Sequence, residues 1–254
     1  MSNASLADRA LESATGLTYL FLYAPIAVVV ILSFQAGGSG LGFTLEWYEN
    51  LLQMDDLYNS LFLSIRIAVF VMVVTTVLGL VAAFGLVRFG WPKRKGAITA
   101  YVALPMMLPI IVYAIGLFIV LINMGMPRGV PAIVLGHVVY TFPFATFVIV
   151  SGMQDLDDSV EEAAMSLGAD ELQTVKEVTL PLLKPSIVAA ALFSFTLSFD
   201  EFLIAFFVSG QDITLPIRIW TMVRTNIAPE VYSISVLVLI ISIGIATLAT
   251  RLEA

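Results

Sequence analysis

Six long apolar runs constrain this chain more than any other feature. They cover residues 17–34, 61–87, 97–122, 131–153, 187–209 and 232–250. The hydrocarbon core of a bilayer is about 30 Å thick, and a helix needs roughly 20 apolar residues to cross it. Within lipid, a helix satisfies its own backbone hydrogen bonds. The runs therefore predict an all-α, polytopic membrane protein with six transmembrane helices.

Composition supports this class and argues against several functions. The chain is 59% hydrophobic and 12% charged, whereas soluble domains are about half apolar and a quarter charged. It contains no cysteine, which excludes a thiolate nucleophile and a cysteine metal site. The net charge of −7 argues against nucleic-acid binding, because phosphate contacts need clustered lysine and arginine.

Lysine and arginine in the loops predict the orientation. The basic residues of the loop after the second run are Arg88, Lys93, Arg94 and Lys95. The loop at 35–59 has no lysine or arginine, so the positive-inside rule places the basic loop in the cytoplasm and loop 35–59 outside. With an even number of spans, both termini and the segment 154–186 are then also cytoplasmic.

The segment 154–186 separates two apolar runs and is polar, yet it has a helical pattern. Its apolar residues recur at helical spacing: Leu156, Val160, Ala163, Ala164 and Leu167. This pattern predicts a helix with Asp157, Asp158 and Glu161 elsewhere on its surface. Gly168 suits the left-handed residue that ends such a helix.

A second short helix is predicted over residues 170–178, with Asp170 as its N-cap. Pro181 and Pro185 should then break the chain before the fifth span. Composition and periodicity leave two interpretations open. The segment is either a solvated linker on the membrane surface or a pair of helices that fills a groove in a partner.

A specific motif favours the second interpretation. Glu162-Ala163-Ala164 is followed after three residues by Gly168, after nine more by Val178, and after one more by Leu180-Pro181. This spacing resembles the EAA motif, E-A-A-x3-G-x9-I-x-L-P, of ABC importer permeases, with valine in place of the usual isoleucine. The stretch "LSFDEFLIAFFVSGQDITLPIRIWTMVRTNIAPEVYSIS" is similar to the second permease subunit of spermidine/putrescine-type systems.

The resemblance implies the type I ABC importer permease fold. Residues 1–58 would hold an N-terminal stretch, the first helix and an exterior loop, and residues 59–254 the core transmembrane domain. The loop 154–186 would form coupling helices that seat in a cleft of an ATPase subunit. The positions that carry the motif are Glu162, Ala163, Ala164, Gly168, Leu180 and Pro181.

The resemblance also implies partners and a location. These are a homologous permease subunit, a dimer of ABC ATPases and an extracytoplasmic solute-binding protein, in the plasma (inner) membrane of a prokaryote. Trp47 and the exterior loops 123–130 and 213–229 would touch the binding protein. The sequence has no G-x4-G-K-[S/T] phosphate loop, so we expect no cofactor or ATPase activity in this chain, with ATP and Mg²⁺ on the partner ATPase. The implied cargo is a polyamine, or alternatively another small solute of the same branch.

Ionisable residues within spans are costly and therefore candidates for function. Asp200 and Glu201 lie along the fifth run. They supply counter-charge to a cationic cargo, or, if the span breaks near Phe199, they brace the outer gate or a neighbouring helix. His137, the single histidine, is expected to make a hydrogen bond between helices.

Two aromatic residues, Tyr113 and Phe144, are candidates for lining the translocation path. The alternative is ordinary helix packing beside a proline kink.

Two rival functions are less consistent with the sequence. An intramembrane enzyme would need a set such as H-E-x-x-H or G-x-G-D, and neither occurs. An ATP-independent secondary transporter predicts an internal repeat of spans. No convincing repeat is present, and that reading leaves the segment 154–186 unexplained.

Overall fold

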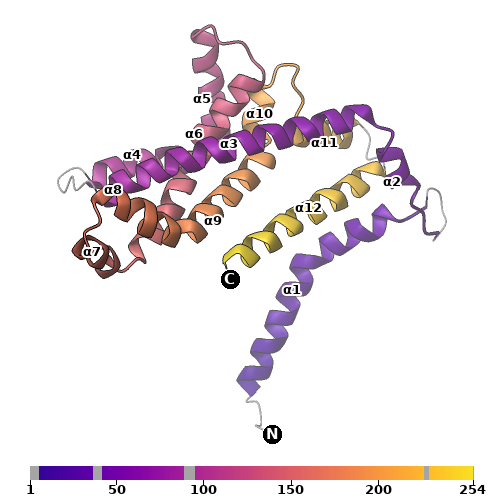
Figure 1. Ribbon diagram of the computed structural model, residues 1–254. Helices are drawn as coiled ribbons and strands as arrows, with labels where there is room; N and C mark the ends of the chain where they lie inside the picture. Colours follow the sequence, from indigo (N-terminus) through magenta and orange to yellow (C-terminus); the bar gives the residue numbers. More distant parts are fainter. Residues whose placement is uncertain (1–5, 37–41, 89–94, 226–228, 254) are drawn as a thin grey trace. The chain divides into compact units, whose positions relative to one another are not determined.

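The computed structural model describes residues 6–36, 42–88, 95–225 and 229–253, so the predicted loop residues Lys93, Arg94 and 226–228 lie outside the described residues. Within these ranges the chain forms helices and no strand, which confirms the all-α class (Figure 1). The elements are α1 (Leu6–Ser33), α2 (Glu46–Leu51), α3 (Asp55–Val87), α4 (Lys95–Met107), α5 (Ile110–Asn123), α6 (Val130–Gln154), α7 (Asp158–Ser166), α8 (Glu171–Thr174), the π-helical η1 (Val175–Thr179), α9 (Leu180–Phe199), α10 (Leu203–Val208), α11 (Leu215–Thr225) and α12 (Glu230–Glu253).

Each of the six apolar runs forms helix, although not every run forms one straight span. Four described helices are long and apolar enough to cross a membrane: Leu11–Ser33, Asp55–Val87, Val130–Gln154 and Glu171–Phe199. The third run forms the pair α4 and α5, which is bent by 97° and counts as a fifth span if taken together. The sixth run forms α12, whose described apolar stretch is the shorter Glu230–Gly244.

The bend in the third run lies at Leu108 and Pro109. Pro109 is the N-cap of α5 and has an extended ψ of 127°. A proline disfavours helical geometry at the residue before it, because its ring clashes with that residue's backbone. The sequence Leu108-Pro109 therefore ends α4 and lets α5 start in a new direction.

The chain divides into two compact units. Unit 1 comprises Met1–Asp55 and Ile219–Ser242, and unit 2 comprises Asp56–Arg218 and Ile243–Ala254. In unit 1, polar contacts join α1 to the elements that follow it. The Ser33 hydroxyl lies 2.7 Å from the Tyr48 hydroxyl, and Ser233 donates to the Ser33 carbonyl at 3.3 Å. The predicted division of the chain at residue 58 remains a prediction.

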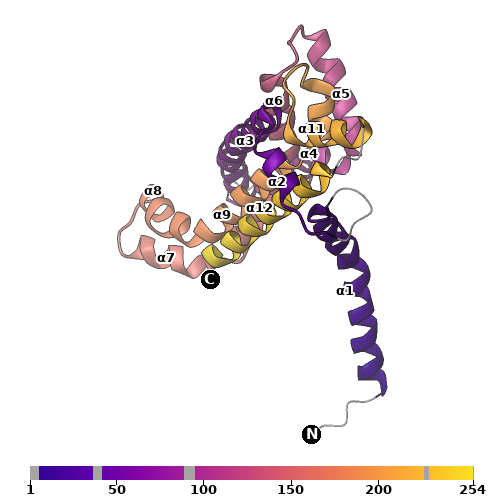
Figure 2. The same ribbon diagram turned by 90° about the vertical axis from the view of Figure 1, so that its right-hand side faces the viewer.

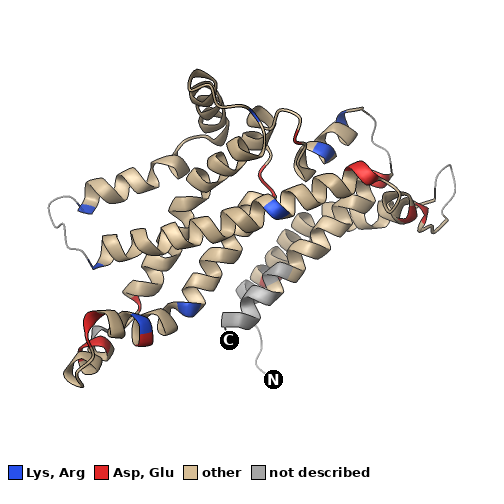
Figure 3. Ribbon diagram, turned by 45° about the horizontal axis from the view of Figure 1, so that its top comes forward, with Lys and Arg blue, Asp and Glu red and all other residues tan. Residues whose placement is uncertain are grey.

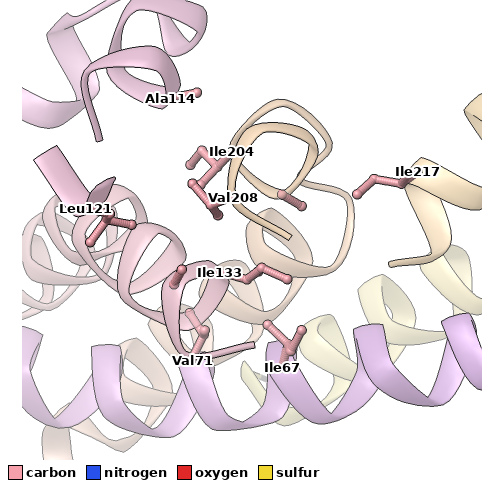
Figure 4. Close-up of a cluster of buried hydrophobic side chains, with 10 residues drawn as sticks. Ile67, Val71, Ala114, Leu121, Ile133, Ile204, Val208 and Ile217 are labelled. Carbon is pink, nitrogen blue, oxygen red and sulfur yellow. The ribbon is translucent and has the colours of Figure 1, made fainter. Parts of the chain in front are cut away.

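Unit 2 contains an apolar core in which α3, α5, α6, α10 and α11 meet. Figure 4 shows the side chains that these helices contribute. The labelled members are Ile67, Val71, Ala114, Leu121, Ile133, Ile204, Val208 and Ile217. A second buried cluster joins α3, α6 and α9 and is rich in alanine: Ala83, Ala145, Ile149, Met153, Leu183 and Ala190. Small residues at helix contacts allow backbones in a membrane to approach closely.

Gly79 is a point of close approach between α3 and α6. A Cβ built on this residue would lie 3.1 Å from both the Ala145 Cβ and the Thr146 amide nitrogen. Thr75, one turn earlier, places its hydroxyl 3.1 Å from that of Thr141. Ala145 and Thr146 of α6 would therefore have to shift to admit a side chain at position 79.

We predict that Gly79→Val separates α3 from α6 and lowers the thermal unfolding midpoint in detergent, because overpacking costs about 1–3 kcal/mol. Gly85→Val is the matched control, since a Cβ on Gly85 of the same helix meets nothing within 4 Å. Equal midpoints for the two variants would contradict the close approach.

Candidate functional site

The two short helices of the segment 154–186 lie together at one end of unit 2. Figures 1 and 2 both show α7 and α8 at the end remote from α5 and α10. Asp157 is the N-cap of α7, and its side chain accepts a hydrogen bond from the Ser159 amide at 2.9 Å. Hydrogen bonds from Ser159 lower the pKa of Asp157, and the opposing effect of burial is smaller.

Gly168 ends α7 in a Schellman motif, as its position in the sequence predicts. Its φ is +98°, in the left-handed region that favours glycine. The Gly168 amide donates to the Met165 carbonyl at 3.0 Å, and the Ala169 amide donates to the Ala164 carbonyl at 3.2 Å. These two bonds satisfy carbonyls that the end of a helix otherwise leaves unpaired. A Cβ at position 168 would meet nothing within 4 Å, so the backbone angle alone requires glycine.

Asp170 starts the next helix with a capping box. Its side chain accepts from the Gln173 amide at 2.7 Å, and the Gln173 side chain accepts from the Asp170 amide at 3.1 Å. This confirms the predicted N-cap and shows that the helix direction is set immediately after the Gly168 turn.

The predicted break at Pro181 and Pro185 is wrong. Helix continues from α8 through η1 into α9, so Glu171–Phe199 is one helix of 29 residues. In the π turn the Leu180 amide donates to the Val175 carbonyl, five residues back. Pro181 is the second residue of α9, directly after the π turn, and has no N–H to donate. The wider π turn thus absorbs the proline without ending the helix.

The motif residues differ in exposure. Glu162, Ala163, Gly168 and Pro181 are exposed, whereas Ala164 and Leu180 are partly buried. The surface around them is unusually apolar, because Leu167 is 91% exposed and Leu172 is 76% exposed. In Figure 3 acidic residues also gather on this segment. The sequence pattern places Leu167 on the apolar face of this helix, and the structure leaves Val160, Ala163 and Leu167 of that face exposed, whereas Leu156 and Ala164 are partly buried.

Glu161 is the main departure from expectation in this segment. It was expected on the surface of α7, but it is only 6% exposed. Its Oε1 accepts hydrogen bonds from Arg88, just after α3, and from the Thr179 hydroxyl in η1, the latter at 2.6 Å. No sequence signal links these three residues, since Arg88 and Glu161 are 73 positions apart.

The environment of Glu161 keeps the carboxylate ionised. Burial by itself raises the pKa of Glu161, but the hydrogen bonds from Arg88 and Thr179 and the positive charge of Arg88 outweigh burial. The net result is a lowered pKa of Glu161.

The fifth run breaks after Phe199, and the break gives its two carboxylates different environments. Asp200 is exposed at the end of α9, whereas Glu201 is 6% exposed. Glu201 Oε2 accepts from the amides of Ile204 and Ala205 at 2.8 and 3.2 Å. It therefore satisfies backbone donors at the start of α10, which would be costly to leave unpaired in lipid.

His137 links α6 to this break. Its Nδ1 lies 2.9 Å from the Ser198 hydroxyl, which confirms the expected hydrogen bond between helices. Its Nε2 lies 3.5 Å from Glu201 Oε2. The histidine thus holds the last turn of α9 and the cap of α10 against one helix.

The predicted path residues Tyr113 and Phe144 belong to one row of aromatic rings. Tyr140 lies between them, with ring centroids 6.1 Å from Tyr113 and 5.7 Å from Phe144. Phe193 of α9 extends the row, 5.8 Å from Phe144. The Tyr113 hydroxyl donates to the Gly136 carbonyl at 2.9 Å. The row joins α5, α6 and α9, and the sequence did not single out Phe193.

Comparison with known proteins places these features in a family. Residues 75–254 match the family described as "Binding-protein-dependent transport system inner membrane component". The spermidine/putrescine transport system permease protein PotC of Haemophilus influenzae is 34% identical over 235 residues, which cover 91% of each chain. The putrescine transport system permease protein PotI of Escherichia coli is 35% identical over 233 residues, which cover 88% of this chain and 83% of PotI.

Solved structures of importers have the same fold. A chain of a bacterial ABC transporter involved in the import of the acidic polysaccharide alginate matches with a TM-score of 0.76 at 14% identity, covering 96% of this chain and 94% of that one. A chain of an amino acid ABC transporter with histidines matches with a TM-score of 0.65 at 18% identity, covering 83% and 99%. These likenesses confirm the expected importer permease fold.

We predict that Glu201→Ala lowers the thermal unfolding midpoint in detergent, because the amides of Ile204 and Ala205 lose their acceptor and leaving buried donors unpaired costs about 1–3 kcal/mol. Asp200→Ala, at the exposed neighbouring position, should change the stability by no more than about 0.5 kcal/mol. A larger loss in Asp200→Ala than in Glu201→Ala would contradict the capping role.

The ion pair of Glu161 predicts a pH dependence. Because the folded-state pKa is lowered, its contribution to stability is complete above the ordinary glutamate pKa of about 4.3 and is lost as the pH falls through the folded-state pKa. The unfolding midpoint of the wild type should therefore exceed that of Glu161→Gln at neutral pH, and the difference should shrink below about pH 4. Glu177→Gln, at an exposed position in η1, should show no such trend.

Proposed function

The chain belongs to the family of inner membrane components of binding-protein-dependent transport systems, and we propose that it acts as one permease subunit of an ATP-binding-cassette importer. In this proposal, α7 of the chain docks on a separate ATPase subunit. The observation that carries the proposal is the exposed end of α7. There, the EAA-motif residues Glu162, Ala163 and Gly168 adjoin Leu167, which is 91% exposed. Val160, Met165 and Leu172 of the same segment are exposed as well, and a group of exposed apolar side chains, unlike a single one, supports a surface for a protein partner.

The geometry of α7 suits docking in a groove. Ala163 allows a close approach, and the Gly168 turn sets the angle between α7 and α8. Glu162 is exposed and can pair with a basic residue of the partner. ATP and Mg²⁺ would be held by the ATPase, and a homologous permease would complete the path through the membrane.

The contact between Arg88 and Glu161 supports the proposed orientation. It brings the end of α3 next to α7, so Arg88 and the segment 154–186 would lie on the same side of the membrane. By the positive-inside rule, that side would be the cytoplasm. Both termini would then be cytoplasmic as well.

On the opposite side, two loops are held together and offer a surface for the solute-binding protein. Asp212 accepts a hydrogen bond from the Val130 amide at 2.9 Å, and the Gly129 amide donates to the Val208 carbonyl at 2.9 Å. The loop before α6 and the loop after α10 therefore form one structure. A loaded binding protein that contacts these loops would bear on α6 and α10 together.

The proposed cargo is a polyamine, the solute named for the relatives PotC and PotI. Asp200 is exposed at the break in the fifth span and would offer transient counter-charge to an ammonium group. The aromatic row through Tyr113 and Phe144 would add cation–π attraction. Glu201 instead accepts hydrogen bonds from backbone amides of α10. It would affect the path by stabilising the break in the fifth span.

The transport cycle then has a simple physical form. ATP binding brings the two ATPase subunits together. The docked α7 and the corresponding helix of the homologous permease move with them. Rigid-body movement of the transmembrane helices switches the path from inward to outward access.

We predict that Gly168→Asp abolishes transport while the protein still inserts into the membrane. A side chain at a φ of +98° is strained, so the Schellman turn and the position of Leu167 are lost. Gly168→Asn should retain more activity, because asparagine tolerates left-handed angles as aspartate does but adds no negative charge beside the exposed Glu162. Uptake by Gly168→Asp at the wild-type rate would contradict the docking role of this turn.

The cargo is tested with the purified complex in proteoliposomes. Binding protein loaded with spermidine or putrescine should stimulate ATP hydrolysis and drive uptake, whereas the same protein offered amino acids or sugars should not. Stimulation by a different solute class would refute the polyamine assignment. Uptake by this chain without an ATPase subunit would refute the importer assignment.

A further inference from the structure

Arg88, Glu161 and Thr179 join three separate elements at one oxygen atom. Arg88 follows the last turn of α3, Glu161 lies in α7, and Thr179 is the last residue of η1. Both Arg88 Nη2 and the Thr179 hydroxyl donate to Glu161 Oε1. We refer to these three residues as the Glu161 link.

The Glu161 link attaches α7 to the end of α3 and to η1 through a buried side chain. Among the described side chains of α7, Glu161 is the buried one, and its neighbours on the helix are exposed or partly buried. Thr179 is fully buried as well. A buried carboxylate is costly unless it is paired and hydrogen-bonded. The carboxylate therefore has a strong preference for this one position between Arg88 and Thr179.

The Glu161 link is also connected, through α9, to the break after Phe199. Thr179 immediately precedes α9, which runs without interruption from Leu180 to Phe199. A helix of 20 residues is about 30 Å long. Its far end is the break that holds Asp200 and the Glu201 cap. A displacement of α7 can thus reach the break through one continuous helix.

We propose that the Glu161 link passes the movement of α7 to α3 and α9, so that Arg88 and Glu161 are positioning residues that couple ATP hydrolysis to transport. This inference rests on the proposed docking of α7 on an ATPase subunit. The link touches neither the docking surface nor the cargo. Its loss should leave docking and hydrolysis intact and separate them from transport.

The decisive measurement is the number of solute molecules taken up per ATP hydrolysed. The full complex is reconstituted in proteoliposomes with spermidine-loaded binding protein. Arg88→Gln and Glu161→Gln should each lower this ratio about tenfold, within the range seen for residues that share a contact. The double variant should lose no more than either single variant, because both substitutions break the same contact.

Further variants separate coupling from folding. Thr179→Val removes the hydroxyl at nearly constant volume and leaves no unpaired charge, so it should lower the ratio even if the charge variants fold poorly. Arg88→Lys keeps the positive charge and should restore part of the ratio. Glu177→Gln and Lys95→Gln, at exposed positions, should leave the ratio unchanged. In all variants the ATPase subunit should still co-purify.

A second readout does not depend on the cargo. The chain has no cysteine, so spin labels can be placed at Ser166→Cys on α7 and Thr196→Cys on α9, both at exposed positions. The distance between the labels should stay narrowly distributed with and without ATP when the link is intact. It should broaden in Arg88→Gln.

These readouts distinguish the possible failures. A wild-type complex that hydrolyses ATP but moves no spermidine would refute the cargo assignment, and the label distances would then decide the link. A wild-type chain that binds no ATPase subunit would refute the proposed docking. Wild-type ratios in Arg88→Gln and Thr179→Val, or losses that multiply in the double variant, would overturn the link itself.

Discussion

Every backbone N–H and C=O within lipid needs a partner inside the protein, and this constraint decides where the chain can depart from straight helix. The break after Phe199 leaves amides unpaired at the start of α10, and Glu201 accepts hydrogen bonds from two of them. The bend at Leu108 and Pro109 meets the constraint differently, since proline has no N–H to leave unpaired.

The short helix α7 divides its surface between the protein and a partner. Successive residues of an α-helix point about 100° apart, because one turn takes 3.6 residues. Glu161 therefore points toward Arg88 and Thr179, while its neighbour Glu162 is exposed. Two adjacent glutamates have unrelated environments for this geometric reason. Glu162 is therefore free to contact a partner in the proposed docking, whereas Glu161 is bound to Arg88 and Thr179.

The continuous helix from α8 to α9 connects the segment 154–186 directly to the break after Phe199. A proline break before the fifth span would have left the segment 154–186 loosely attached to the membrane domain. Instead, the π turn at Val175–Thr179 accommodates Pro181, and helix extends to Phe199. The start of α8, next to the proposed docking surface on α7, and the break at Asp200 therefore lie at opposite ends of one continuous helix.

The sequence alone determined the features that depend on near neighbours along the chain. The apolar runs require helices, Gly168 takes the left-handed turn, Asp170 caps the next helix, and the EAA spacing identifies the family. Only the tertiary structure decided the burial of Glu161, the capping by Glu201 rather than Asp200, and the aromatic row that includes Phe193. The burial of Glu161 and the aromatic row depend on residues that packing brings together from distant positions. The different roles of Asp200 and Glu201 depend on how the chain turns between α9 and α10, and neither the turn nor the packing is visible in local hydrophobic periodicity.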